Sequence, residues 1–154
     1  MDTQLAAYLL SAAVKVSGLP PVPIESLPEF IPMPGSMLKA EACKEKVANC
    51  RGIVALYDME RNRVLYRDDL NVDDPSDNSF LVHELVHVLQ YAQGGDAIYK
   101  DCPSLVQTER AAYAAQNMYL HAQGQLLRVG RIMQFARCAP PPGTTAAAHE
   151  PTTH

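Results

Sequence analysis

The chain contains the stretch Ser79-Phe80-Leu81-Val82-His83-Glu84-Leu85-Val86-His87-Val88-Leu89-Gln90-Tyr91, which decides its fold. Leucines and valines surround its two histidines, and this pattern predicts a core helix that is apolar on most of its faces. His83 and His87 are four residues apart, so on a helix both imidazoles project from one face, one turn from each other. The stretch therefore predicts a buried helix with one polar stripe.

The polar stripe has the H-E-x-x-H pattern of a zinc site. Two neutral imidazoles at this spacing can bind one Zn²⁺ at about 2.0–2.1 Å each. Glu84 would lie beside the metal rather than on it, which is the position of a general base that activates water. The alternative is a core helix whose two histidines have ordinary hydrogen-bond partners and whose Glu84 is exposed. The apolar context favours the metal site.

A catalytic zinc needs a third protein ligand. The extended pattern H-E-x-x-H-x-x-G-x-x-H does not apply, because Gln90 and Gln93 occupy its glycine and last histidine positions. We expect Glu109, which follows His87 by 22 residues and lies early in the next helix, to complete a His₂Glu set. The alternative is a surface glutamate that forms a local ion pair with Arg110 or another residue. Substitute ligands would be His121, Asp101 and Asp96.

Tyr113 follows Glu109 by four residues and lies on the same helical face. Its hydroxyl could bond to a ligand or stabilise a developing oxyanion. The alternative is a tyrosine of the core. Rivals for the oxyanion role are Tyr91, Tyr99, Tyr119 and His121.

The composition is that of a globular protein. The 154 residues are 47% hydrophobic, enough for one domain with a real core. The net charge is −4 and the basic residues are scattered, so nucleic acid and anionic membranes are not expected partners. No apolar run reaches the roughly 18–20 residues of a membrane span.

Four widely spaced cysteines are present: Cys43, Cys50, Cys102 and Cys138. They form no C-x-x-C pair, and two disulfides suit their even number. Of the three possible connectivities we favour Cys43–Cys50, which closes a local loop, and Cys102–Cys138, which ties the last helices together. This predicts a periplasmic or secreted protein, and four reduced thiols of a cytoplasmic protein are the alternative. Residues 1–17 do not resemble a signal peptide, so an exported form would have had its leader removed.

The hydrophobic periodicity predicts an α+β fold, in which a small twisted sheet packs on a mainly helical domain. We expect a single domain over residues 1–138 and a disordered tail over 139–154. The domain starts with a helix within 1–18 and a Pro-rich extended segment over 19–35. Further helices are expected over 36–47, 103–123 and 125–137, and the histidine helix is expected to end near Gln93. An edge strand is expected near Glu29–Ile31.

The remaining strands form a hairpin before the histidine helix. Gly52–Tyr57 is almost continuously apolar and is expected to be central. Arg63–Arg67 returns as the second strand, with Val64 and Tyr66 on one face and Leu65 on the other. An acidic loop follows, in which Ser76 or Asp77 is the expected N-cap of the histidine helix. A calcium loop is the alternative reading of its aspartates.

The motif His83-Glu84-x-x-His87 followed by Glu109-x-x-Ala112-Tyr113 resembles the gluzincin class of zinc metallopeptidases. Residues 50–120 are also similar to the compact minigluzincins and to a family of small bacterial proteins. The resemblance implies a zinc-dependent hydrolase of peptides or proteins, with an edge strand along the substrate cleft, here Arg63–Arg67. Larger gluzincins often carry an acidic residue where this chain has Tyr113.

Three functions are therefore compared. The first is a peptidase in which Zn²⁺ activates water and Glu84 is the general base. The second is a catalytically silent or latent zinc-binding module that acts as a binding or inhibitory protein. The third is a structural domain held by disulfides without metal. Glu84 argues against the silent module, because zinc binding does not need it. A latent peptidase would use residues 19–34 as the blocking element.

Overall fold

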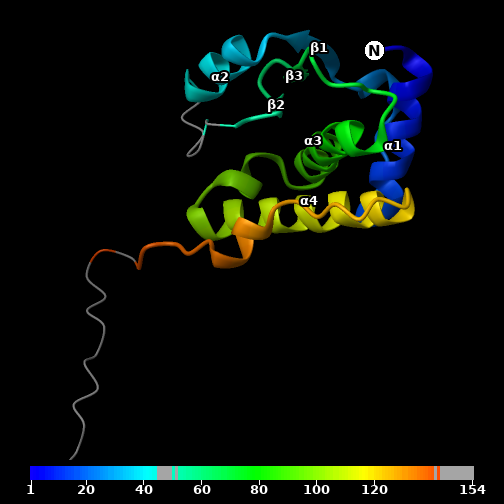
Figure 1. Cartoon of the computed structure of the whole chain (residues 1–154). Helices are drawn as coiled ribbons and strands as arrows, with labels where there is room; N and C mark the ends of the chain where they lie inside the picture. The colour runs from blue at the N-terminus through cyan, green and yellow to red at the C-terminus, as the bar shows by residue number, and fades with distance from the viewer. Residues whose placement is uncertain (45–49, 51, 141, 143–154) are drawn as a thin grey trace, which may run out of the picture.

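The computed structural model describes residues 1–44, 50, 52–140 and 142 of the chain (Figure 1). The described residues form an α+β fold, as the sequence predicts. Its helices are α1 (Thr3–Ser17), α2 (Gly35–Lys44), α3 (Pro75–Gly94) and α4 (Cys102–Ala122). Its strands are β1 (Glu29–Met33), β2 (Ala55–Asp58) and β3 (Arg63–Arg67). Short 3₁₀ helices cover Ile24–Ser26, Gly95–Tyr99 and Arg131–Phe135. Residues 45–47 of the expected second helix, and nearly all of the expected tail over 139–154, lie outside the described residues.

The sheet has the order β1-β3-β2. β2 and β3 form the expected antiparallel hairpin, and β1 pairs with β3 in parallel. The prediction that the first hairpin strand is central and Arg63–Arg67 is an edge is therefore wrong, because β1 occupies the second side of β3. Pro32 lies in β1, an edge strand, where a missing backbone N–H is tolerated.

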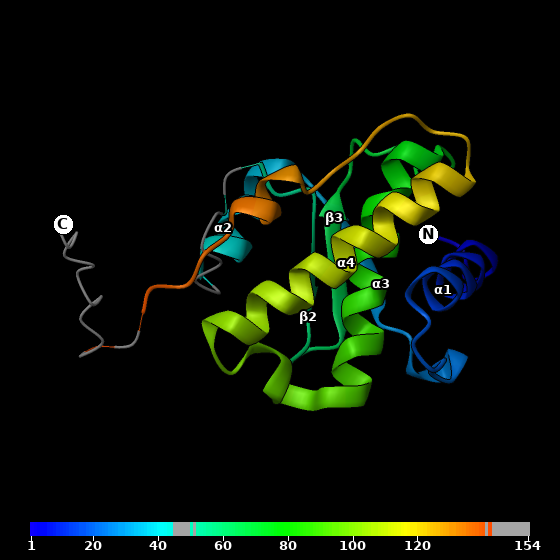
Figure 2. The ribbon, with the colours of Figure 1, turned by 90° about the horizontal axis from the view of Figure 1, so that it is seen from below.

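The two faces of the sheet are covered by different helices. Val64 and Tyr66 are buried in the main core with the aliphatic residues of α3, as their alternation predicts. Leu65 points the other way and is also buried, on the face that α2 covers. The molecule is therefore layered as α2, sheet, α3 and α4, with α1 packed against both α3 and α4 (Figures 1 and 2).

The Pro-rich segment is part of this framework. Its residues 29–33 form β1, and Leu19, Val22 and Leu27 pack against the core. Because β1 lies on the side of β3 away from β2, the segment is a structural strand. The expectation that residues 19–34 block a cleft is wrong.

The acidic loop starts α3. Asp74 is the N-cap, and its carboxylate accepts hydrogen bonds from the backbone N–H groups of Ser76 at 2.8 Å and Asp77 at 3.3 Å. Pro75 at the first helical position explains why the cap lies before Ser76 and Asp77. Asp77 instead accepts from the backbone of Asn71. Across the described residues, the loop's aspartates form no group that could hold a metal.

After α4 the chain folds back along that helix as residues 125–138, which we call the C-terminal strap (Figure 2). The prediction of a helix over 125–137 is wrong, since only Arg131–Phe135 form a 3₁₀ helix. Gly130 has φ +69° and interrupts any helix there. Asn117 holds the strap, since its side chain donates to the carbonyl of Val129 and accepts from the N–H of Val129.

Two disulfides are formed, Cys43–Cys50 and Cys102–Cys138, as predicted. The second ties the strap to the start of α4. Disulfides of this kind indicate an oxidising compartment. Within the described part of the chain, no helix combines the length and the apolar character that crossing a membrane requires.

Candidate metal centre

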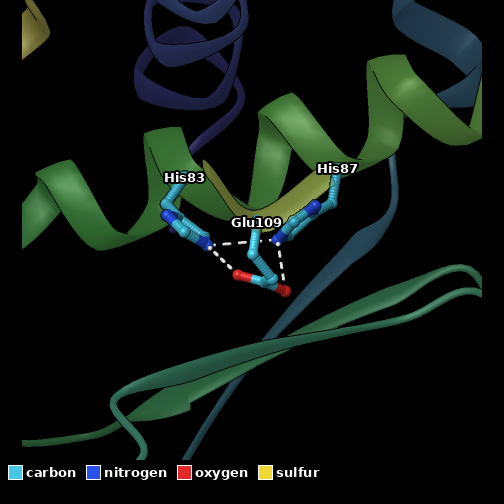
Figure 3. Close-up of side chains that lie close together, drawn as sticks. All are labelled: His83, His87 and Glu109. Carbon is cyan, nitrogen blue, oxygen red and sulfur yellow. Dashed lines mark hydrogen bonds and ion pairs between the residues drawn. The ribbon is translucent and has the colours of Figure 1, made fainter. Parts of the chain in front are cut away.

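Helix α3 presents the two histidines. Residues 81–89 are all buried, so the helix is fixed on almost every side by the core. His83 and His87 are 6% and 4% exposed, and both rings project toward the β2–β3 hairpin (Figure 3). Their Nε2 atoms lie 3.1 Å apart. The prediction that the two imidazoles share one face is therefore confirmed.

Helix α4 presents Glu109 to the same place. Asp101 caps this helix by accepting from the N–H of Ser104, and Pro103 lies in its first turn. The helix therefore begins at Cys102, seven residues before Glu109. One oxygen of Glu109 lies 3.3 Å from Nε2 of His83, and the other lies 3.3 Å from Nε2 of His87. These three side chains are the only group within the described residues that could hold a metal ion (Figure 3).

The distances fit a four-coordinate ion. Around a tetrahedral zinc with ligands at about 2.0–2.1 Å, neighbouring donor atoms are about 3.4 Å apart. The observed separations are 3.1 Å between the Nε2 atoms of His83 and His87, and 3.3 Å from each to Glu109. The group is therefore suited to bind a metal ion.

The charges of these side chains also favour the binding of a cation. Burial lowers the pKa of His87, but its hydrogen bond to Glu109 and the negative charges of Glu109 and Glu84 outweigh burial and raise that pKa to about 9. Burial also raises the pKa of Glu109, but the two histidines more than offset it and hold that pKa far below its ordinary value. Glu109 thus stays ionised, and the site attracts a positive charge. Its carboxylate is 27% exposed and gives solvent access to the group.

Glu84 lies next to this group without joining it. The residue is buried, which excludes the alternative of an exposed glutamate on a core helix. Its Oε2 accepts a hydrogen bond of 2.8 Å from the backbone N–H of Tyr57 in β2. Across the described residues Oε1 has no hydrogen-bond partner, so this oxygen is available for proton transfer. β2, rather than Arg63–Arg67, is therefore the strand whose backbone bonds to the histidine helix at Glu84.

Two tyrosines flank the histidines. The ring of Tyr113 packs edgewise on His83 with centroids 4.4 Å apart, and Tyr99 lies 6.2 Å from His87. Burial, together with the charges of Glu109 and Glu84, raises the pKa of both hydroxyls, so each stays a hydrogen-bond donor at neutral pH. Neither hydroxyl bonds to another side chain or to the backbone within the described residues. Tyr113 stays a candidate, and Tyr99 is its closest rival.

The other candidates have different partners. Asp96 accepts from the hydroxyl of Tyr91, Asp101 caps α4, and the hydroxyl of Tyr119 donates to Asn78. His121 is exposed in the last turn of α4, about 18 Å along the helix from Glu109. None of these residues belongs to the described metal group. Arg110, which the alternative reading paired with Glu109, instead donates to the carbonyls of Met133 and Ala136.

Sequence reasoning missed two glutamines. The Oε1 atom of Gln90 lies 2.8 Å from Nδ1 of His87, and that of Gln116 lies 3.1 Å from Nδ1 of His83. Gln90 follows His87 by three residues, a spacing that puts both side chains on one face. Gln116 follows Glu109 by seven residues, which is two turns of the same face. These spacings are the signal that could have found both.

A family model described as a domain of unknown function, DUF6647, matches residues 22–141. The match spans the sheet, α2, α3 and α4, and so includes the whole metal group, whereas α1 lies outside it. No curated protein and no solved structure matches the chain significantly. Because the matched range is more than half of the 154 residues, the chain belongs to the DUF6647 family.

Proposed function

We propose that this protein is a zinc-dependent metallopeptidase of the gluzincin type. The observation that supports the proposal most is the convergence of His83, His87 and Glu109 beside a buried Glu84 whose one oxygen is held by a backbone N–H. Two imidazoles and one carboxylate at tetrahedral spacing are a ligand set typical of catalytic zinc. Zinc also suits this mixture of nitrogen and oxygen donors better than Mg²⁺ or Ca²⁺, which favour oxygen alone.

The residues divide the work as follows. His83 and His87 would hold the ion through Nε2, and Glu109 through its carboxylate. A bound zinc would supply Lewis-acid polarisation of the scissile carbonyl and acidify a water molecule. Glu84 takes a proton from the water at Oε1 and returns it to the leaving nitrogen, while the N–H of Tyr57 keeps its Oε2 in place.

The substrate we propose is a peptide or protein segment in extended conformation. Among the residues that the structure describes, β2 pairs only with β3, so its other edge is unpaired within the sheet. The carbonyl of Val54 accepts from Arg67, and the alternation of an antiparallel ladder therefore turns the N–H and C=O groups of Ala55 and Tyr57 away from β3. The bond from Tyr57 to Glu84 runs in this outward direction. An extended substrate that adds to this edge would lie beside the metal group.

The disulfides support a finer statement on compartment. Cys43–Cys50 and Cys102–Cys138 would be reduced in an ordinary cytosol. We place the proposed peptidase in the periplasm or outside the cell, where both disulfides persist.

Metal content is the first test. Elemental analysis should find about one zinc per chain in the wild type, and little in His83→Ala or Glu109→Ala. His121→Ala is the matched control, because this exposed histidine is outside the group and should leave the zinc content unchanged. Zinc retained by Glu109→Ala would contradict the ligand set.

Catalysis is tested separately with a library of unstructured peptides. The zinc-loaded wild type should cleave some members, and Glu84→Gln should bind zinc normally but lose at least about 10²-fold in rate. Zinc binding without any cleavage would refute the peptidase proposal and favour the silent zinc-binding module. Equal cleavage by Glu84→Gln would refute the role of Glu84.

A further inference from the structure

The hydrogen bonds behind the two histidines decide which nitrogen carries each proton. Behind His87, Gln90 offers Oε1 to Nδ1 at 2.8 Å, and its Nε2 donates to the backbone carbonyl of Thr108 at 3.1 Å. A carbonyl can only accept, so the amide group must turn its NH₂ toward Thr108 and its oxygen toward His87. Nδ1 of His87 must therefore carry the hydrogen.

A second chain of hydrogen bonds stands behind His83. Gln116 offers Oε1 to Nδ1 at 3.1 Å and donates through Nε2 to the hydroxyl of Ser79 at 3.0 Å. Ser79 gives its single hydrogen to the carbonyl of Ser76 at 2.7 Å, so toward Gln116 it can only accept. Gln116 and Ser79 are completely buried, and this orientation is the one that gives the carbonyl of Ser76 its bond from Ser79. The chain of hydrogen bonds therefore assigns the hydrogen of His83 to Nδ1 as well.

From these chains we infer that Gln90 and Gln116 are positioning residues that hold both imidazoles as the Nδ1–H tautomer. This inference rests on the metal centre of the proposed function. A neutral imidazole with its hydrogen on Nδ1 has a lone pair on Nε2, and both Nε2 atoms face Glu109 at 3.3 Å. The opposite tautomer would put a hydrogen where the metal must bind. Outer partners of this kind typically change metal affinity by about 10–100-fold.

The two glutamines differ in what can replace them. In Gln90→Glu, a carboxylate oxygen would face the carbonyl of Thr108, and two acceptors at about 3.1 Å repel each other. In Gln116→Glu, the hydroxyl of Ser79 can rotate and donate to the new carboxylate. The carbonyl of Ser76 loses that bond but keeps its place in the helical ladder of α3. Position 90 therefore requires an amide, whereas position 116 accepts a carboxylate.

Zinc affinity, measured by competition with a chromogenic chelator, tests this difference. Gln90→Met, Gln116→Met and Gln90→Glu should each weaken zinc binding by about 10–100-fold. Gln116→Glu should stay within about threefold of wild type or bind more tightly, since a charged acceptor makes the histidine a better ligand. Matched controls are Gln93→Met on α3 and Gln107→Met on α4, both exposed and outside these chains. Equal affinities of Gln90→Glu and Gln116→Glu, or an unchanged affinity in both Met variants, would overturn the inference.

The tautomers themselves are read by long-range ¹H–¹⁵N spectra of the neutral histidine rings in metal-free Glu109→Ala, where the carboxylate that faces both Nε2 atoms at 3.3 Å no longer competes for their hydrogens. This variant should show Nδ1–H for His83 and His87, and adding either Met substitution should give a mixture at the ring that lost its partner. Nε2–H at either ring of Glu109→Ala would contradict the inference. Zinc binding without peptide cleavage would refute only the peptidase proposal.

Discussion

Substituting Gly130 with alanine should displace Tyr113 and destabilise the protein. A Cβ atom at Gly130 would lie 2.2 Å from Cγ and 2.3 Å from Cδ1 of Tyr113, far inside van der Waals contact. Gly130 also has φ +69°, a conformation that alanine adopts only with strain. The strap cannot easily move away, because Asn117 holds Val129 on one side and Arg110 holds Met133 on the other.

The magnitude has two parts. The left-handed conformation costs alanine about 1–2 kcal/mol, and the overpacking against Tyr113 costs about 1–3 kcal/mol more. Gly124 separates the two, since it has φ +71° but no atom within 4 Å of an added Cβ. Gly124→Ala should therefore lose only the first part. For a chain of this size, each kcal/mol lowers Tm by about 2–4 °C.

Urea unfolding of the two alanine variants measures the difference. Gly130→Ala should be less stable than Gly124→Ala by about 1–3 kcal/mol, and should bind zinc less tightly because Tyr113 packs on His83. In a double-mutant cycle with Tyr113→Ala, the two substitutions together should lower the free energy of unfolding by less than the sum of their separate effects, since removal of the ring relieves the overlap. Equal losses in the two glycine variants, or no coupling to Tyr113, would refute the steric argument.

Three further predictions concern the metal centre and its helix. Tyr99→Phe and Tyr113→Phe should both keep zinc, and the one that removes an oxyanion donor should lose about 10²–10³-fold in kcat; wild-type rates in both would exclude the two tyrosines. In metal-free protein, burial lowers the pKa of His87 but Glu109 raises it to about 9, above its ordinary 6.5. The resulting stabilisation is complete below about pH 6.5 and is lost as the pH rises to about 9, so the free energy of unfolding should fall over this range. Calorimetry measures this slope, and His87→Gln should abolish it. Asp74→Ala removes the N-cap of α3 and should cost about 1 kcal/mol in urea unfolding; an unchanged midpoint would exclude the cap.

The ligand group could be predicted because helical geometry dictates most of it. Residues four apart share a face, so His83 and His87 meet in any helix. Predicting Glu109 as a ligand also required that its helix fold back on the histidine helix. Glu109 could be singled out because it is the only glutamate between His87 and the C-terminal tail. Cysteine pairing was predictable for a similar reason, since few combinations exist.

The order of strands could not be predicted in the same way. Alternation along Arg63–Arg67 shows which side chains are buried, and both faces of β3 are indeed covered. It does not show which strand pairs on each side of β3, because backbone groups carry no sequence signal. The parallel pairing of β1 with β3 depends on how α2 crosses the sheet.

The helix predicted over the C-terminal strap does not form, for a physical reason. Residues 125–137 have apolar residues that suit a helix, but Leu126 and Ile132 are 99% and 72% exposed. Helix propensity is weak when no apolar face can be buried. The backbone conformation is then set by the hydrogen bonds between Asn117 and Val129 and by the left-handed conformation of Gly130.

The short connection between α3 and α4 has a consequence for the order of folding. Only 22 positions separate His87 from Glu109, so closing that loop in an unfolded chain costs about 3 kcal/mol of entropy. Structural zinc sites contribute about 10–16 kcal/mol of binding free energy. If the proposed zinc binds with even part of this energy, it can hold the two helices together before the sheet has formed. Metal-loaded chains would then fold from a helical hairpin outward, whereas metal-free chains must first assemble the core that joins α1, α3 and β3.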